Sequence, residues 1–172
     1  MTTAPLILTL KLDQESFDRF NALRQQYFPP ERNLLSAHVT LFHALPGEQI
    51  FSIQETLKSV CSQTAPLPLY FPQLRFLGRG VAIEVDCPQL VQARQQLAKG
   101  WQPWLTPQDR QGYRPHLTIQ NKVTATVARQ FYEQLSRTWQ ASHGWGEGLL
   151  LWHYQGGPWQ LAAEFLFNST VL

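Results

Sequence analysis

Residues 38–41 read His-Val-Thr-Leu (HVTL) and residues 116–119 read His-Leu-Thr-Ile (HLTI), so one four-residue pattern occurs twice in the chain. Side chains at positions i and i+2 of a β-strand point to the same face of its sheet. The histidine and threonine of each copy therefore share one face, and the two apolar residues share the other. If the apolar faces pack on the core, two such sheets facing each other would bring both histidine–threonine pairs into one cleft.

The repetition of this pattern is the main evidence that it marks a functional site. A histidine and a threonine on one strand most often play a structural part, so a single copy would be weak support for a site. The chain has only five histidines, and two of them occupy the same setting. We therefore treat His38, Thr40, His116 and Thr118 as one candidate site.

Two imidazoles and two hydroxyls suit acid–base chemistry at phosphorus. The unperturbed pKa of imidazole lets it take or give a proton near neutral pH. A neutral histidine can deprotonate an attacking water or hydroxyl while a protonated one protonates the leaving oxygen, and threonine hydroxyls can donate hydrogen bonds to phosphoryl oxygens. No metal is required. Metal binding by His38 and His116 is the weaker alternative, because the sequence offers no third ligand at a recognisable spacing.

The apolar pattern along the chain predicts alternating strands and helices. The predicted strands span residues 5–12, 35–45, 67–77, 81–85, 113–120, 147–154 and 159–167. The predicted helices begin at Asp13 and end before Pro29, span 50–60, run from Pro88 to Trp101, and include Val127, Phe131 and Leu135. The strand pairs 67–77 with 81–85 and 147–154 with 159–167 are expected as hairpins. This order is typical of an α+β fold with mainly antiparallel pairing, and a helix and a hairpin after each motif strand suggest an internal duplication.

The composition indicates one globular domain spanning residues 1–172. Hydrophobic residues make up 44% of the chain, which suffices for a core, and the net charge of +2 is mildly basic. That charge suits a small anionic ligand or a nucleotide end, and not the strongly basic face that wraps long duplexes. No apolar run reaches transmembrane length, residues 1–13 lack the basic start of a signal peptide, and Cys61 and Cys87 have no metal or redox spacing. We expect a cytoplasmic monomer with reduced thiols and no membrane partner.

The chain resembles the 2H phosphoesterase superfamily, and within it the bacterial 2′-5′ RNA ligase / RNA 2′,3′-cyclic phosphodiesterase group. Residues 38–41 and the longer segment 113–119 (YRPHLTI) carry the resemblance, and residues 151–159 resemble the closing hairpin of that group. The resemblance implies a bilobal α+β fold. In that fold two mainly antiparallel sheets are related by a pseudo-twofold axis, with helices on the outside and a catalytic cleft between.

The resemblance also implies an activity and roles for the four motif residues. His38 and His116 would be the acid–base pair, Thr40 and Thr118 would bind the phosphate, and no metal or other cofactor would be needed. The implied reaction opens a 2′,3′-cyclic phosphate at an RNA or small-nucleotide end to a 2′-phosphate, with His116 favoured as the base and His38 as the acid. Two alternatives stay open: a module that binds a nucleotide or RNA end without turnover, and 2′-5′ RNA ligation by the reverse reaction.

Four flanking residues are further candidates for substrate contact. Strand alternation places Phe42 on the same face as His38, where it could stack on a base, or it could belong to the core. Tyr113 and Arg114 precede the second motif, where each could contact phosphate or base. In the alternative, Tyr113 packs in the strand and Arg114 is solvated. The segment Gln120-Asn121-Lys122 stands where the resemblance leads us to expect Ala/Gly-Arg, so Lys122 is expected to supply the positive charge.

His43 departs from the pattern of the resembling group, which leads us to expect an apolar or aromatic residue there. Strand alternation places His43 on the face opposite His38, so we expect it to bond backbone or water at a strand end. Arg75 and Arg79, beside a glycine turn, could reach a phosphate if that hairpin borders the cleft, but a solvated turn is expected.

Overall fold

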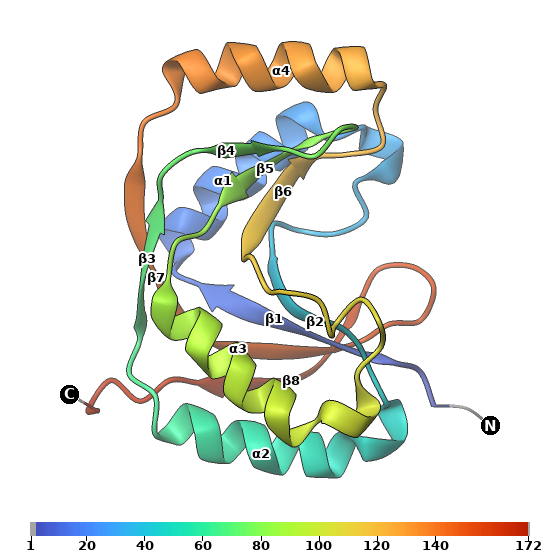
Figure 1. Ribbon diagram of the computed structural model, residues 1–172, viewed down its shortest axis with the longest axis vertical. Coiled ribbons are helices and arrows are strands. Elements are labelled where there is room, and N and C mark those ends of the chain that lie inside the picture. Colours follow the sequence, from blue (N-terminus) through green and yellow to red (C-terminus); the bar gives the residue numbers. More distant parts are fainter. Residues whose placement is uncertain (1–2, 172) are drawn as a thin grey trace.

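Two antiparallel β-sheets form the framework of the fold. The computed structural model describes residues 3–171, and its larger sheet has five strands and its smaller sheet three (Figure 1). The larger sheet contains β1 (Leu6–Leu12), β2 (Val39–Leu45), β3 (Leu67–Phe71), β7 (Ser142–His153) and β8 (Gln160–Leu166). The smaller sheet contains β4 (Leu74–Phe76), β5 (Val81–Glu84) and β6 (His116–Gln120). The α+β class and its antiparallel pairing are as the sequence predicts.

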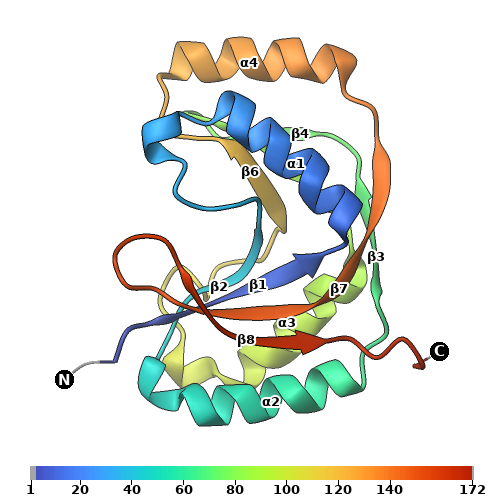
Figure 2. The same cartoon turned by 180° about the vertical axis from the view of Figure 1, so that it is seen from behind.

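Helices cover both ends of this framework. The α-helices are α1 (Gln14–Tyr27), α2 (Ile50–Ser62), α3 (Pro88–Gly100) and α4 (Ala125–Thr138), and short 3-10 turns span Pro30–Arg32, Gly47–Gln49 and Gln102–Trp104. Figures 1 and 2 show α1 and α4 beside the smaller sheet at one end, and α2 and α3 beside the larger sheet at the other. None of these helices is both long and apolar enough to cross a membrane.

Helix α1 begins where the sequence predicts. The Asp13 carboxylate accepts a hydrogen bond from the Ser16 amide at 3.1 Å, which satisfies one of the free donors of the first turn. The helix buries Phe20 and Arg24 and stops before Pro29, whose ring disfavours a helical residue in front of it. Helix α1 contacts β6, so the helix that follows β1 of the larger sheet packs on the smaller sheet.

The predicted strand 67–77 is wrong as one element. It breaks at Pro72 and Gln73 into β3, which pairs with β7 in the larger sheet, and β4, which pairs with β5 in the smaller one. Proline lacks the N–H that continues a ladder, so the chain leaves one sheet there and enters the other. Strand β7 also begins earlier than predicted, because three glycines obscure its alternation. A side chain at Gly144 would collide with Ser16 at the start of α1.

One hydrophobic cluster runs through both sheets. It includes Leu8 and Leu151 of the larger sheet together with Ile83 and Leu117 of the smaller sheet, and all four are buried. The two halves of the molecule therefore share a core, and the cleft between them is a surface feature of one packed body.

Candidate active site

The two repeated motifs lie on strands from different sheets. His38 directly precedes β2 and Thr40 lies within it, while His116 and Thr118 lie in β6. The apolar residues between and after them are fully buried, as the alternation predicts: Val39, Leu41, Leu117 and Ile119. Their burial anchors each strand, and the polar residues face the opposite side.

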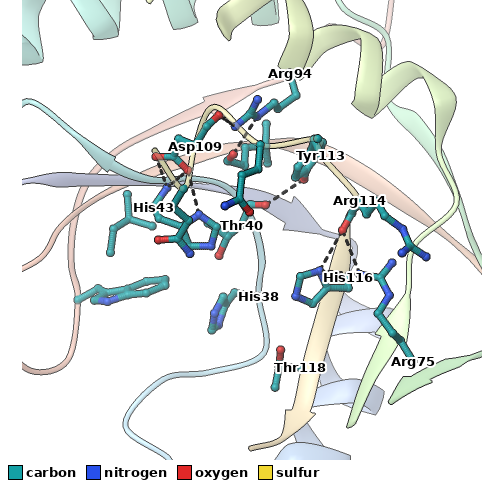
Figure 3. Close-up of a pocket in the computed structure, with 16 residues that line it drawn as sticks. His38, Thr40, His43, Arg75, Arg94, Asp109, Tyr113, Arg114, His116 and Thr118 are labelled. Carbon is teal, nitrogen blue, oxygen red and sulfur yellow. Dashed lines mark hydrogen bonds and ion pairs between the residues drawn. The ribbon is translucent and has the colours of Figure 1, made fainter. Parts of the chain in front are cut away.

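All four motif residues line one cleft of about 440 Å³. Figure 3 shows His38 and Thr40 on one side and His116 and Thr118 on the other. The loop carrying Tyr113 closes one side. The structure therefore brings together the residues that the sequence assigns to one site. The cleft holds polar donors suited to an anion. Among residues 3–171, no group of three His, Cys, Asp or Glu side chains is placed to hold a metal ion.

The two imidazoles are oriented in the same way. Nδ1 of His38 lies 2.7 Å from the Ser36 carbonyl oxygen, and Nδ1 of His116 lies 3.0 Å from the Arg114 carbonyl oxygen. In each case the partner is the main-chain oxygen two residues earlier. A carbonyl only accepts, so Nδ1 donates and the unprotonated Nε2 is left for the cleft. The repeated sequence pattern thus includes a repeated side-chain geometry.

Burial lowers the pKa of both imidazoles. The pKa of His38 falls to about 4, chiefly through burial and further through the positive charge of Arg24. The pKa of His116 is lowered by burial and by the guanidinium of Arg75, whose Nη1 lies 3.3 Å from Nδ1 of His116. Both rings are therefore neutral at pH 7 in the free cleft, and each can accept a proton at Nε2.

Two buried arginines hold the backbone of the motif strands. Arg24 of α1 donates to the carbonyl oxygens of Thr118 and Leu35, both at 2.9 Å, so it joins β6 to the segment before His38. Arg94 of α3 donates to the Leu41 carbonyl oxygen at 3.1 Å. Each motif strand is thus fixed by a guanidinium from a helix, which satisfies carbonyl groups that burial would otherwise leave costly.

A β-bulge in β2 changes which residues face the cleft. Thr40 pairs with Thr9, but Phe42 pairs with Leu8, so Leu41 is an extra residue on the β2 side. An extra residue reverses the alternation beyond it. Phe42 is therefore fully buried, against Trp101 at a centroid distance of 5.2 Å, and His43 lies in the cleft.

This register corrects two expectations. Phe42 packs in the core under the Arg94 guanidinium and is not available to stack on a base. His43 faces the same side as Thr40, not the opposite side, and its Nδ1 lies 2.9 Å from the carboxylate of Asp109. The bulge arises from the pairing of β2 with β1, which the alternation within one strand does not reveal.

The remaining predicted contacts divide into three cases. Tyr113 lines the cleft and donates from its hydroxyl to the Thr40 carbonyl oxygen at 2.9 Å, so it positions the first motif. Arg114 also lines the cleft, with Nη2 3.5 Å from Glu84. Lys122 is exposed in the turn after β6, with φ of 63°, and lies outside the residues that line the cleft. Lys122 therefore does not supply the positive charge that the sequence led us to expect at the site.

Three further residues line the cleft. Arg75 of β4 borders it, which is the alternative to the expected solvated turn, and its Nε lies 3.3 Å from Glu84. Asp109 is buried beneath His43. Trp159 contacts His38 edge-on at a centroid distance of 4.8 Å. No short-range sequence pattern marks these residues as a group, because folding brings together segments that are distant in the chain. The resemblance of residues 151–159 to a closing hairpin included Trp159.

Two antiparallel sheets around a cleft with paired His-x-Thr strands define the 2H phosphoesterase class. The family model of the 2′-5′ RNA ligase superfamily matches residues 12–158, and the chain belongs to that superfamily. A comparison with curated proteins gives no match.

Solved structures share the fold. The crystal structure of TT0787 of Thermus thermophilus has a TM-score of 0.70 at 14% identity, covering 96% of this chain and 99% of that one. E. coli LigT complexed with 3′-AMP has a TM-score of 0.68 at 14% identity with the same coverage. E. coli LigT complexed with phosphate has a TM-score of 0.62 at 13% identity, covering 98% of this chain and 99% of that one. At such identities the likeness concerns the fold.

Proposed function

We propose that this protein is a phosphodiesterase that opens 2′,3′-cyclic phosphates at RNA or nucleotide ends to 2′-phosphates without a metal or other cofactor. The observation that carries the proposal is the pair of imidazoles, each held at Nδ1 by a main-chain oxygen and each with Nε2 free for one cleft. The superfamily match supports phosphoester chemistry. E. coli LigT, which has the same fold, was solved with 3′-AMP and with phosphate, and this supports a nucleotide ligand.

The proposed reaction uses one histidine on each side of phosphorus. His116 takes a proton from water through Nε2, and the hydroxide oxygen forms a bond to phosphorus. The bond from phosphorus to O3′ breaks, and protonated His38 gives its proton to O3′, which leaves as the 3′-hydroxyl. Thr40 and Thr118 hydroxyls donate to the non-bridging oxygens as negative charge develops on them. Exchange of one proton with solvent at each ring restores the starting state.

Burial and a neighbouring guanidinium lower the pKa of both rings, with Arg24 acting on His38 and Arg75 on His116, so the assignment of His116 as base and His38 as acid follows the resemblance to the superfamily. Burial is the main cause of the lowered pKa of His38, and an anionic phosphate in the cleft favours the protonated ring. Substrate binding thus helps to charge the acid.

Substitution of either histidine tests the proposal. His38→Ala and His116→Ala should each lower kcat by about 10²–10⁴-fold, because each removes one proton-transfer group. His153→Ala, which removes a histidine outside the cleft lining, is the matched control. Rates are measured on a nucleoside 2′,3′-cyclic phosphate and on an oligonucleotide with a cyclic-phosphate end. The 2′- or 3′-product is identified, EDTA is present in a parallel series, and circular dichroism checks the fold. Parental rates in either variant would refute the assignment.

The same assay separates the two alternatives. A binding module would hold the nucleotide tightly and release it unchanged, although a pure binder gains little from two titrating rings. Ligation would join an RNA 5′-hydroxyl to a cyclic-phosphate end through the same residues, with that hydroxyl as the nucleophile in the place of water and O3′ again as the leaving group. RNA halves belong in the substrate panel for that reason, and mass action in water favours hydrolysis.

A further inference from the structure

A third histidine, His43, faces the cleft with a carboxylate behind it. Its Nδ1 lies 2.9 Å from Oδ1 of Asp109 (Figure 3). The His43 side chain is 45% exposed, whereas the Asp109 side chain is 1% exposed. Because the carboxylate accepts, Nδ1 donates to it and Nε2 is left for the cleft.

The side-chain contact is not needed to hold the strand. The Asp109 carboxylate already accepts hydrogen bonds from the main-chain amides of His43, at 2.9 and 3.0 Å, and of Ala44, at 3.1 Å. The Asp109 carbonyl oxygen in turn accepts from Arg94 at 2.6 Å. These bonds fix the loop against β2 whatever side chain stands at position 43. The imidazole contact adds only the orientation of the ring.

The carboxylate distinguishes His43 from the other two cleft histidines. Burial opposes ionisation of Asp109, but hydrogen bonds from the His43 side chain and from the His43 and Ala44 amides outweigh it, and the pKa of Asp109 is lowered. Asp109 is thus ionised at neutral pH. The ionised carboxylate is the partner of His43 at Nδ1, whereas His38 and His116 have neutral carbonyl partners. With Nδ1 held by Asp109, the His43 ring presents Nε2 to an anion in the cleft.

His43 lies farther along the cleft than Thr40, which is proposed to bind the scissile phosphate. On the cleft face of β2 it is the next side chain after Thr40, one strand repeat of about 7 Å along. Figure 3 shows His43 on the His38 side of the cleft, and Arg75 and Arg114 on the His116 side. Both arginines face the Glu84 carboxylate, which offsets part of their charge. His43 therefore extends the anion site on the His38 side.

We propose that His43, oriented by Asp109, binds a second phosphate of the substrate. The inference rests on the proposed function and narrows it: the cleft takes a nucleotide chain end, in which a phosphodiester precedes the cyclic phosphate, in preference to a cyclic mononucleotide. The four motif residues serve the scissile phosphate, and His43 donates a charge-assisted hydrogen bond to the 5′-phosphate of the same nucleotide.

Binding of product analogues tests this without requiring turnover. Calorimetry compares adenosine 2′,5′-bisphosphate with adenosine 2′-monophosphate on the parental protein and on His43→Asn, which can still bond Asp109 but presents no donor at the place of Nε2. The parental protein should bind the bisphosphate about tenfold more tightly, and the variant should lose most of that preference. His43→Lys, which places an ammonium group at this position, should restore part of it. His143→Asn, at an exposed histidine outside the cleft lining, is the control for net charge.

The outcomes separate this inference from the proposed function. An unchanged preference in His43→Asn, an equal loss for both ligands, or no preference in the parental protein would overturn the second-phosphate role. A parental protein that hydrolyses a cyclic mononucleotide but shows no such preference contradicts only the role of His43. A protein that shows the His43-dependent preference but hydrolyses neither a cyclic mononucleotide nor its 5′-phosphorylated form contradicts only the proposed function.

Discussion

At the residue scale, both histidines of the repeated motif are neutral at pH 7 in the free protein, yet the proposed reaction needs one of them protonated. The pKa of His38 is about 4 and that of His116 is also lowered, with burial as the main cause at both rings. A bound phosphate carries the negative charge that favours a protonated ring. In the proposed reaction, arrival of the substrate would therefore favour protonation of the acid.

This coupling predicts the pH dependence of the reaction. Because both pKa values are lowered, the bell-shaped profile of kcat/KM, which reports the free protein, should have its maximum below pH 6.5. The profile of kcat, which reports the complex, should be displaced to higher pH by the bound anion. Initial rates across pH 4–9 at fixed ionic strength measure both. A kcat/KM maximum above pH 7 would contradict the burial of the pair.

Residue-level prediction from the sequence succeeded where strand alternation alone decides a side chain's face. The buried partners Val39 and Leu117 are of this kind, and so is the convergence of His38 and His116. The prediction failed at Phe42, which follows the β-bulge at Leu41 in β2. The bulge depends on how β2 pairs with β1, and that pairing is a property of two segments.

At the element scale, the two motif strands depend on helices that follow strands of the opposite sheet. Helix α1 follows β1 of the larger sheet but sends Arg24 to Thr118 in the smaller one. Helix α3 follows β5 of the smaller sheet but sends Arg94 to Leu41 in the larger one. In each unit of strand, helix and motif strand, the helix therefore binds the motif strand of the other unit. These units differ from the duplication suggested by the sequence, in which each motif strand is followed by a helix and a hairpin.

Removal of one of these arginines should lower the stability of the folded protein. Arg24→Met leaves the carbonyl groups of Leu35 and Thr118 without their donor, so the free energy of unfolding should fall by about 3 kcal/mol. Arg137→Met, at an exposed arginine of α4, should change it by less than about 0.5 kcal/mol. Urea unfolding measures both variants. Equal stabilities would show that the Arg24 bonds contribute nothing net.

At the scale of the whole molecule, strand β7 joins three other strands of the larger sheet. Its first residues pair with β3, its later residues pair with β8, and β1 pairs with residues 146–153. The shared hydrophobic cluster continues into the smaller sheet. The α+β class was predictable from the order of apolar patterns, and the presence of two sheets was implied by the resemblance to the superfamily. The division of residues 67–77 between the sheets was not, because it depends on which distant strand offers the free edge.

A single core predicts a single unfolding transition. Urea curves followed by far-ultraviolet circular dichroism, which reports secondary structure, and by near-ultraviolet circular dichroism, which reports aromatic packing, should coincide. Adenosine 2′-monophosphate should raise both midpoints equally, because it binds only the folded protein. Sedimentation at several concentrations checks the expected monomer. Two separate transitions, one for each sheet, would contradict the shared core.

The place of β7 in the chain also sets the order in which the fold can form during synthesis. Strand β1 ends at Leu12, but its long partner begins only at Ser142. As a ribosome makes the protein, β1 and β2 can pair early, while the edge that β7 will occupy stays open until most of the chain has emerged. Such distant pairing slows folding and leaves an unpaired edge available for aggregation. The nascent chain should therefore depend on chaperones until β7 is released from the ribosome tunnel.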